Sequence, residues 1–476
     1  MATFHLVNFG CRASQADGAA LKNQLLQAGL EEVGSAEQSH IAVLNTCTVT
    51  SRADAEVRQM IRRIHRSNPN CRILVTGCYA QRAPQEIARL QGVAWVVGNS
   101  HKHTVPELLK KATGPETQRL DATAHEIRTA STGSQPQLVQ LQSTRAERER
   151  TASESERASG ASSAQVLVGE ISEEFHFVPT FPDDRTRPTL KVQDGCNARC
   201  SFCVIPYVRG ESRSLAPEMV IEQVRELERA GYKEIVLSGI NLGSYGRDLD
   251  QRITFLGLLE RILAETSIAR IRISSIEPMD VSRELIRLVA REPRLARHFH
   301  VPLQSGCDRI LREMNRRYWT RQYAERILAI REQIPDCGIG ADVMVGFPGE
   351  TAEDHATSAR FIESLPFTYL HVFPYSSRPS TPAALRPEPV NGRIAHERGR
   401  EIRSLMEAKR RAFLAVQMGK TLSALTLAEA EEGARVTLSS NYLKILLPGS
   451  DAAPNNLLDV RVGRIHGGLL YGYPET

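Results

Sequence analysis

The chain has 476 residues, 41% of them hydrophobic and 24% charged, which is typical of a globular protein with about three domains. It has no apolar run of the roughly 18 residues that a membrane-spanning helix needs, and its start, MATFHLVNFG, does not resemble a secretory signal. The net charge of +5 permits a nucleic-acid partner without requiring one. Because the nine cysteines are clustered, we expect metal binding or catalysis rather than disulfides, in the cytoplasm.

Residues 1–112 alternate between short apolar segments rich in β-branched residues and segments with helical periodicity. Because such alternation builds parallel sheets covered by helices, this region predicts an α/β fold with a doubly wound parallel sheet. The expected strands are residues 4–9, 41–45, 73–76 and 94–97, and the expected helices include residues 15–28 and 53–66.

Residues 113–185 differ in composition, with no aromatic residue between Gly114 and Glu174 and a stretch rich in Ser, Arg and Glu. Such a segment buries too little apolar surface to offset the entropy lost on ordering. We therefore interpret most of it as a flexible linker or insertion, with a helix that orders on a partner as the alternative. Residues 174–181, EFHFVPTF, are expected to form a strand at the edge of the next domain.

Residues 186–385 return to strand–helix alternation, and six such repeats predict a closed or partly open barrel of parallel strands. A basic helix is expected over residues 388–418. The period-two pattern of residues 419–476 predicts a small antiparallel β-barrel. The expected core strands are residues 189–193, 234–239, 270–276, 298–303, 341–346 and 369–374, with helices such as 216–230, 255–265 and 320–333.

Three cysteines follow the first expected barrel strand, where active sites of such barrels are built. Cys196, Cys200 and Cys203 have the spacing C-x3-C-x2-C. Three thiolates on one loop can hold three irons of a [4Fe–4S] cluster and leave the fourth iron open. A zinc site would need a fourth ligand, and His176 is the only Cys or His nearby. Three unrelated core cysteines are the remaining alternative.

This run, with Phe202 before the last cysteine, resembles the signature of the radical S-adenosylmethionine (SAM) superfamily. The resemblance implies that SAM chelates the open iron and is cleaved to a 5′-deoxyadenosyl radical. It also implies a (β/α)6 partial barrel whose strand ends bind SAM. Each matching stretch has low specificity alone, since Glu277 or Gln304 could equally be a satisfied polar residue at a strand end. The implied SAM-binding residues are Phe202, Ser238, Gly239, Asn241, Ser275, Glu277 and Gln304.

Three further cysteines, Cys11, Cys47 and Cys78, each follow an expected parallel strand. Because the carboxyl ends of parallel strands share one edge of a sheet, the three can converge on one site. Gly10 and Gly77 precede two of them and allow close approach of a bulky group. The alternative is three buried apolar cysteines. Cys71, Cys307 and Cys337 lack this pattern and are assigned to the core or surface.

The two cysteine triads in this domain order resemble the methylthiotransferase family. That resemblance implies a second [4Fe–4S] cluster on Cys11, Cys47 and Cys78, and a terminal RNA-binding TRAM barrel that includes Ser440–Tyr442. The implied domains are an N-terminal methylthiotransferase domain (1–112), a linker (113–185), a radical SAM core with a trailing helix (186–418) and the TRAM domain (419–476).

The context Gly10-Cys11-Arg12-Ala13-Ser14-Gln15 looks most like the branch acting on N6-threonylcarbamoyladenosine in tRNA. The alternatives are the isopentenyladenosine branch and the branch acting on a ribosomal-protein aspartate. A non-catalytic RNA-binding protein with zinc in its cysteine sites is a rival of another class.

The resemblance implies that SAM serves twice, once to methylate a sulfur on the second cluster and once as radical source. Hydrogen is removed from C2 of modified adenosine 37, and the methylthio group then joins that carbon. The implied partners are the tRNA anticodon loop and an electron donor such as flavodoxin or ferredoxin, with no membrane partner. No catalytic residue beyond the cluster ligands is assigned.

Arg209 and Arg213 follow the cysteine loop, where we expect either a role near the site or structural ion pairs. Other basic residues are expected to contact tRNA phosphates, with solvated helix faces as the alternative. These are Arg58, Arg62, Arg63, Arg66, Arg309, Arg312, Arg316, Arg317 and Lys409–Arg411.

Overall fold

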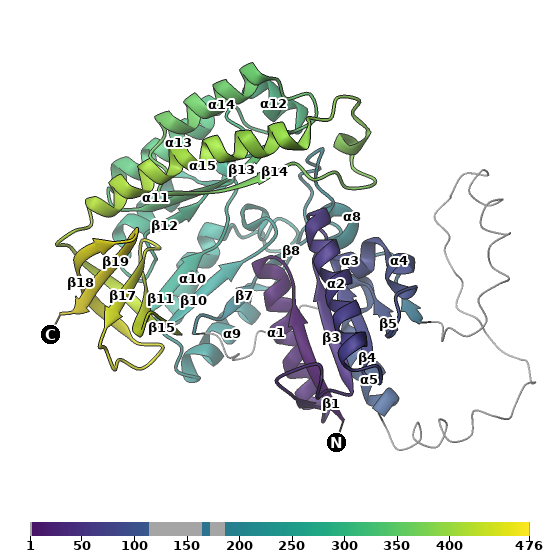
Figure 1. Ribbon diagram of the computed structural model, residues 1–476. Helices are drawn as coiled ribbons and strands as arrows, with labels where there is room; N and C mark the ends of the chain where they lie inside the picture. The colour runs from purple at the N-terminus through teal and green to yellow at the C-terminus, as the bar shows by residue number, and fades with distance from the viewer. Residues whose placement is uncertain (1, 114–163, 172–185, 476) are drawn as a thin grey trace, which may run out of the picture. The chain divides into compact units, whose positions relative to one another are not determined.

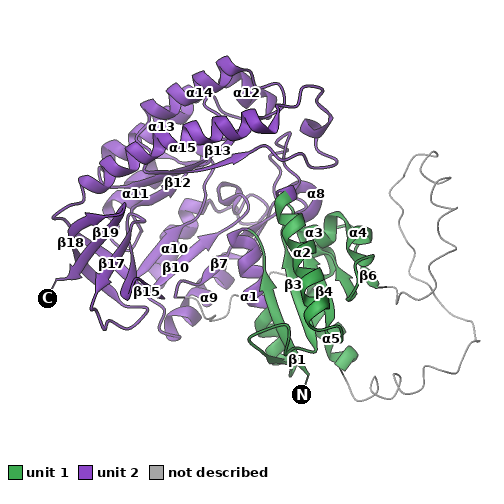
Figure 2. Cartoon of the chain, in the orientation of Figure 1, with its two compact units in different colours: residues 1–10, 21–48, 52–178 green, residues 11–20, 49–51, 179–476 purple. Residues whose placement is uncertain are grey.

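A computed structural model describes residues 2–113, 164–171 and 186–475, and the chain falls into two compact units (Figure 2). The smaller unit contains residues 1–10, 21–48 and 52–178, and the larger contains 11–20, 49–51 and 179–476. The segment 11–20, with Cys11 and the first turns of a helix, is thus grouped with the larger unit.

The smaller unit is built on a six-stranded parallel sheet in the order β2-β1-β3-β4-β5-β6 (Figure 1). Apolar clusters cover both faces of the sheet, and in α2 the residues Val57, Ile61 and Ile64 point into one of them at helical spacing. The doubly wound α/β prediction is confirmed. The strands are β1 (Thr3–Asn8), β2 (Glu31–Glu32), β3 (Ile41–Thr46), β4 (Arg72–Gly77), β5 (Val93–Val97) and β6 (Gln165–Leu167). The helices of residues 2–113 are α1 (Arg12–Gln27), whose first turns are grouped with the larger unit, α2 (Ser51–Ser67), α3 (Cys78–Arg82), α4 (Pro84–Ala88), η1 (Asn99–Thr104) and α5 (Val105–Thr113).

Strand β6 lies inside the segment interpreted as a linker and pairs in parallel with β5. Its three residues are too few to show a period in the sequence, and the linker interpretation, which was made for most of residues 113–185, does not hold for residues 165–167. The strand expected over residues 174–181 lies outside the described residues.

The core of the larger unit consists of two three-stranded parallel sheets, β7-β10-β11 and β12-β13-β14. A parallel bridge between Ser275 and His300 joins them, so that the six strands form an open partial barrel as expected. Its strands are β7 (Thr189–Lys191), β10 (Glu234–Ser238), β11 (Arg270–Ile273), β12 (His298–His300), β13 (Gly338–Val345) and β14 (Tyr369–Pro374). The short pair β8 (Gln193–Asp194) and β9 (Arg213–Ser214) is antiparallel.

Helices alternate with these strands, and the longest, α15, packs against β14 (Figure 1). The helices are α8 (Ile205–Arg209), α9 (Pro217–Arg229), η2 (Leu242–Ser244), α10 (Phe255–Glu265), η3 (Pro278–Asp280), α11 (Arg283–Arg291), α12 (Asp308–Glu313), α13 (Thr320–Gln333), α14 (Ala352–Ser364), η4 (Pro382–Leu385) and α15 (Gly392–Ala415).

Five strands after α15 close into a barrel in the order β15-β16-β17-β19-β18. The sequence predicts only antiparallel pairs, but β17 and β19 are parallel, which corrects that expectation. A direct hairpin forces antiparallel neighbours, whereas β17 and β19 are separated by β18 and are free to run the same way. The strands are β15 (Thr421–Glu431), β16 (Ala434–Ser439), β17 (Lys444–Pro448), β18 (Leu457–His466) and β19 (Leu469–Pro474).

The loop after β16 closes the end of the partial barrel where its strands begin. Arg272 donates hydrogen bonds of 3.0 Å to the carbonyls of Ser439 and Ser440. Gly338, at the start of β13, lies so close to Asn441 that a Cβ would be 2.2 Å from its carbonyl oxygen. The opposite end, where strands β7 and β10 finish, carries the cysteine loop. No helix among the described residues is long and apolar enough to cross a membrane.

Candidate active site

The loop that carries Cys196, Cys200 and Cys203 follows β8 and is fixed by its own backbone. Gly195 has φ of +72°, and a Cβ there would be 1.8 Å from the carbonyl oxygen of Glu211. Only glycine fits, because both the left-handed conformation and the close approach exclude a side chain. The Cys196 N–H donates to the Gly210 carbonyl at 3.0 Å. The chain is therefore turned tightly at the point where the first thiol is presented.

Two of the three thiols, Cys196 and Cys203, lie in an environment that makes their ionisation costly without a cation. Burial, together with a smaller contribution from the neighbouring thiols Cys200 and Cys196, raises the pKa of Cys203 to about 12. Burial also raises the pKa of Cys196. Bound iron would supply the missing positive charge, so this donor set fits an iron–sulfur cluster. Among the described residues, no group of three His, Cys, Asp or Glu side chains is arranged to hold a single metal ion.

Arg316 is the cation that the structure itself places at the loop. Its Nη1 donates to Cys200 Sγ at 3.2 Å, and its Nη2 forms an ion pair with Glu277. The Arg316 side chain is only 5% exposed. The sequence interpretation that grouped Arg316 with phosphate-binding arginines is wrong, because this guanidinium faces the cysteine loop. It follows α12, and no spacing pattern in the sequence connects it with the cysteines.

A cavity of about 300 Å³ opens beside the loop, and Cys200, Asn241, Glu277, Arg316 and Tyr318 are among its lining residues. Its lining combines one thiol with three amides, three carboxylates and three guanidinium groups, and its size lies at the lower end of small-molecule sites. Burial raises the pKa of Glu277, while Arg316 opposes that rise. The cavity thus offers both acceptors and donors for a ligand that carries an amine and a carboxylate.

Asn241 has the geometry expected for binding a ligand next to the cysteines. Its backbone N–H donates to Gln193 Oε1 at 2.7 Å, and its Nδ2 lies 3.9 Å from Cys196 Sγ. Its buried Oδ1 has no hydrogen-bond partner among the described residues. Because buried polar atoms are almost always satisfied, this oxygen points to a missing donor such as an ammonium group. Gly239 is needed here, since a Cβ would lie 2.8 Å from Gln193 Oε1.

The other predicted SAM-binding residues are placed less directly. Ser238 is buried at the end of β10, and Phe202 packs on the apolar cluster that contains Phe347. Ser275 is exposed, and neither it nor Gln304 lines the cavity. Gln304 has φ of +66°, and its buried Oε1 has no partner among the described residues. Gln193 positions Asn241 by accepting its backbone N–H. The sequence analysis did not identify Gln193, because it belongs to no recognisable motif.

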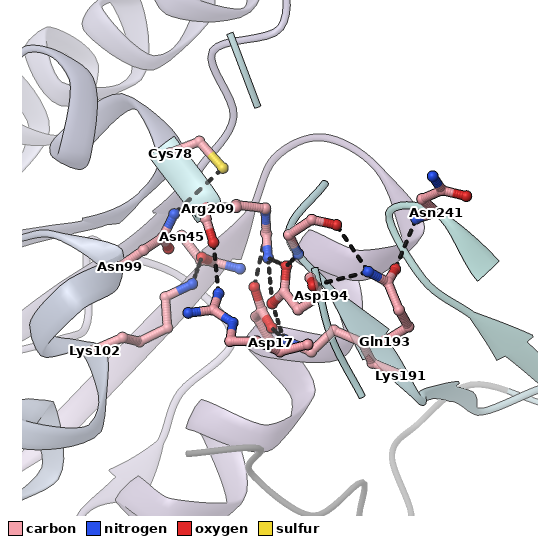
Figure 3. Close-up of polar contacts among 12 residues, drawn as sticks. Asp17, Asn45, Cys78, Asn99, Lys102, Lys191, Gln193, Asp194, Arg209 and Asn241 are labelled. Carbon is pink, nitrogen blue, oxygen red and sulfur yellow. Dashed lines mark hydrogen bonds and ion pairs between the residues drawn. The ribbon is translucent and has the colours of Figure 1, made fainter. Parts of the chain in front are cut away.

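Behind the cysteine loop lies a buried cluster of four charged side chains, the charge quartet Asp17, Lys191, Asp194 and Arg209 (Figure 3). Arg209 pairs with Asp17 and with Asp194, each at 2.9 Å. Lys191 pairs with Asp194 at 2.8 Å and also with Asp17. Asp194 accepts the Gly195 N–H at 2.8 Å. Arg209 therefore forms the structural ion pairs that the sequence left as one of two alternatives.

The smaller unit places Cys47 and Cys78 directly after the neighbouring strands β3 and β4, and both are buried. Gly10 follows β1 with φ of +99°, and a Cβ there would be 2.4 Å from the Cβ of Cys47. Asn99 Nδ2 lies 3.5 Å from Cys78 Sγ (Figure 3). Cys11 is exposed and belongs to the larger unit. Its convergence with the other two stays a prediction.

The remaining cysteines, Cys71, Cys307 and Cys337, are buried and follow the expected assignment to the core. Among the predicted phosphate contacts, Arg309 is used in an ion pair with Asp354, and Arg58 pairs with Glu86 at 2.8 Å. Arg58 and Arg309 thus have partners within the protein, so their presence does not require a bound nucleic acid.

Comparison with known protein families and solved structures shows to which superfamily the core of this chain belongs. The radical SAM superfamily model matches residues 190–362, and the model described as uncharacterized protein family UPF0004 matches residues 3–98. The solved structure of the radical SAM methyltransferase TsrM from Kitasatospora setae, with cobalamin and a [4Fe–4S] cluster bound, has a TM-score of 0.54 at 15% identity, covering 81% of this chain and 77% of that chain. The larger unit thus contains a radical SAM domain over residues 190–362, and the cofactors of such a domain are SAM and an iron–sulfur cluster.

The family then follows from close relatives. Threonylcarbamoyladenosine tRNA methylthiotransferase MtaB of Aquifex aeolicus (strain VF5) is 37% identical over 443 residues, which is 92% of this chain and 95% of that protein. MtaB of Bacillus subtilis (strain 168) is 34% identical over 480 residues, which is 100% of this chain and 95% of that protein. The chain belongs to this family of radical SAM methylthiotransferases.

Proposed function

We propose that this enzyme converts N6-threonylcarbamoyladenosine at position 37 of tRNA to its 2-methylthio derivative, in the cytoplasm, with two [4Fe–4S] clusters. The observation that supports this proposal is the cavity beside the loop of Cys196, Cys200 and Cys203. The relatives of this chain are named for this activity. The alternatives, isopentenyladenosine in tRNA and a ribosomal-protein aspartate, have less support.

In this proposal Cys196, Cys200 and Cys203 hold the cluster that binds SAM. When bound together, SAM and the cluster supply one-electron chemistry that activates a C–H bond. The unpartnered Oδ1 of Asn241 accepts a hydrogen bond from the SAM ammonium. Arg316 holds Glu277 in place and donates a hydrogen bond to Cys200 Sγ. Phe202, Ser238, Gly239, Ser275 and Gln304 complete the proposed SAM site.

The second cluster is assigned to Cys11, Cys47 and Cys78. The close approach of Gly10 to Cys47 supports this assignment, because it leaves the strand end free of any side chain that would fill the space beside the thiol. A sulfur and a carbon-centred radical couple only at near-contact distance, so the proposed reaction requires both clusters to reach the same adenine. Adenosine 37 lies in a single-stranded loop and can be splayed out at low cost.

The C-terminal barrel is proposed to bind RNA as a TRAM domain, and flavodoxin or ferredoxin is proposed as the electron donor. The proposed domains are residues 1–112, 113–185, 186–418 and 419–476.

The function is tested by mass spectrometry of tRNA nucleosides from cells with and without the gene. Loss of 2-methylthio-threonylcarbamoyladenosine, with accumulation of its unthiolated precursor, is expected. An unchanged level of that nucleoside would refute the substrate. Iron and sulfide analysis of anaerobically purified protein tests the cofactors, with about eight irons per chain expected for two clusters. A content near four irons would refute the second cluster.

A further inference from the structure

The larger unit contains a group of polar aromatic side chains that the proposed chemistry does not use. Tyr369 Oη shares hydrogen bonds with His298 Nε2 at 2.8 Å and with His300 Nδ1 at 3.0 Å. The Tyr442 ring stacks on His298 with 4.3 Å between centroids. Since Tyr442 also lies 5.4 Å from the Arg272 guanidinium of the other sheet, the group occupies the interior of the partial barrel.

One cation reaches this interior from the segment next to the proposed cluster ligand Cys11. Arg12 Nη2 donates to Tyr442 Oη at 3.2 Å, and the Arg12 side chain is half-buried. Burial lowers the pKa of His298 and of His371, and the charge of Arg12 lowers both further. Arg12 thus places a guanidinium beside a group of imidazole and phenol side chains.

No carboxylate in the described part of the chain pairs with Arg12, in contrast to Arg272 and Arg316. Arg272 pairs with Glu234 at 2.8 Å, and Arg316 pairs with Glu277. Asp342 is paired instead with His300, at 3.1 Å. A partly buried guanidinium without an anionic partner is unfavourable. The position of Arg12 therefore points to an anionic ligand.

The proposed substrate carries such an anion. The threonylcarbamoyl group on N6 ends in a free carboxylate, whereas an isopentenyl group is apolar and uncharged. C2 and C6 of adenine flank N1 on the same edge of the base, so the N6 substituent and the reacting carbon are close neighbours. A residue bonded directly to a ligand of the sulfur-carrying cluster is therefore well placed to reach that substituent.

We propose that Arg12 binds the carboxylate of the threonylcarbamoyl group and thereby selects this substrate, with the Tyr442 hydroxyl orienting the guanidinium. The inference rests on the proposed function. Arginine suits this role because its planar fork donates two parallel hydrogen bonds to a carboxylate.

The test measures binding of the holoenzyme to anticodon stem-loops that carry adenosine, threonylcarbamoyladenosine or isopentenyladenosine at position 37, by fluorescence anisotropy. Wild type is expected to prefer the threonylcarbamoyl stem-loop. In Arg12→Gln this preference is expected to fall about 10- to 100-fold, the loss typical of a charge-assisted hydrogen bond. Affinity for the unmodified stem-loop should stay unchanged. Arg12→Lys should retain part of the preference, and the exposed Arg321→Gln on α13 should retain all of it.

Survival of the full preference in Arg12→Gln would overturn the inference. An equal loss for all three stem-loops would also overturn it, because Arg12 would then contact the backbone phosphates. Product analysis in parallel separates the two proposals. If wild type forms the 2-methylthio product and Arg12→Gln keeps the preference, only the role of Arg12 fails. If wild type neither prefers nor modifies the threonylcarbamoyl stem-loop, the proposed function fails as well.

Discussion

The two cysteine triads are positioned in different ways. Cys196, Cys200 and Cys203 lie on one tight loop, held by Gly195 and by the Arg316 contact to Cys200. Cys47 and Cys78, by contrast, depend on the parallel order of strands β3 and β4. A loop motif carries its geometry within a few residues, whereas a strand-end site exists only once the sheet has formed. The geometry of the cysteine loop should therefore be sensitive to local contacts, whereas that of the strand-end cysteines should be sensitive to the packing of the sheet.

Removal of a cluster ligand should have the largest effect and should separate the two triads. Cys200→Ala is expected to reduce both SAM cleavage and product formation to background. Cys47→Ala should abolish the methylthio product but leave SAM cleavage, measured as 5′-deoxyadenosine by chromatography. Cys71→Ala, a buried cysteine of the core, is the control and should keep both activities. Loss of SAM cleavage in Cys47→Ala would show that the triads are not independent.

Breaking the charge quartet should cost the most stability. Arg209→Met leaves Asp17 and Asp194 without their shared guanidinium in a buried site, and about 3–5 kcal/mol of unfolding free energy should be lost. Denaturant unfolding of the purified protein measures the change. Arg321→Met removes an exposed pair with Glu325 and should cost less than about 1 kcal/mol. Equal costs for the two variants would show that the quartet is not a stabilising element.

Arg316 tests whether the cysteine loop depends on its neighbouring cation. Arg316→Gln leaves the thiol of Cys200 and the carboxylate of Glu277 without their donor. We expect a loss of about 10- to 100-fold in the rate of SAM cleavage, as for groups that support metal ligands. The loaded iron content serves as a second readout. An unchanged rate together with unchanged iron would contradict the role of Arg316.

A smaller effect is expected for glycine at the strand-end site. Gly10→Ala places a methyl group 2.4 Å from the Cβ of Cys47 at φ of +99°, so both strain and a clash result. About 1–3 kcal/mol of stability should be lost, with a lower iron content. Gly29 has φ of +87° but no neighbouring atom within 4 Å, so Gly29→Ala isolates the strain alone. The difference between the stability losses of the two variants measures the cost of the clash with Cys47. Equal losses would show that this close contact does not matter for stability.

The sequence predicted those elements whose period is long enough to recognise. Apart from β2 and β6, the parallel strands of both units were predicted to within a few residues, as were the helices given as examples. Strands β2 and β6 were missed because two and three residues show no alternation, and the parallel pairing of β17 with β19 was missed because pairing direction depends on the closed barrel. Cys196, Cys200 and Cys203 were found from spacing alone.

The polar residues around that loop were harder to find. Gln193 and Arg316 act on the site through contacts between segments far apart in the chain, and nothing in their local sequence marks them. Arg316 was assigned to phosphate binding because its neighbours in the sequence are arginines. In the structure its side chain is buried and contacts Cys200 and Glu277 instead. The partners of the quartet likewise come from α1, β7, β8 and α8, which only the folded chain brings together.

The closure of the partial barrel by Ser439, Ser440 and Asn441 makes the core depend on the C-terminal barrel. The carbonyls of Ser439 and Ser440 accept hydrogen bonds from Arg272, which is paired with the buried Glu234. Without residues 439–441, two donors of this buried guanidinium lose their acceptors, and such a loss is costly. The C-terminal barrel therefore contributes to the stability of the partial barrel as well as to any contact of its own with a ligand.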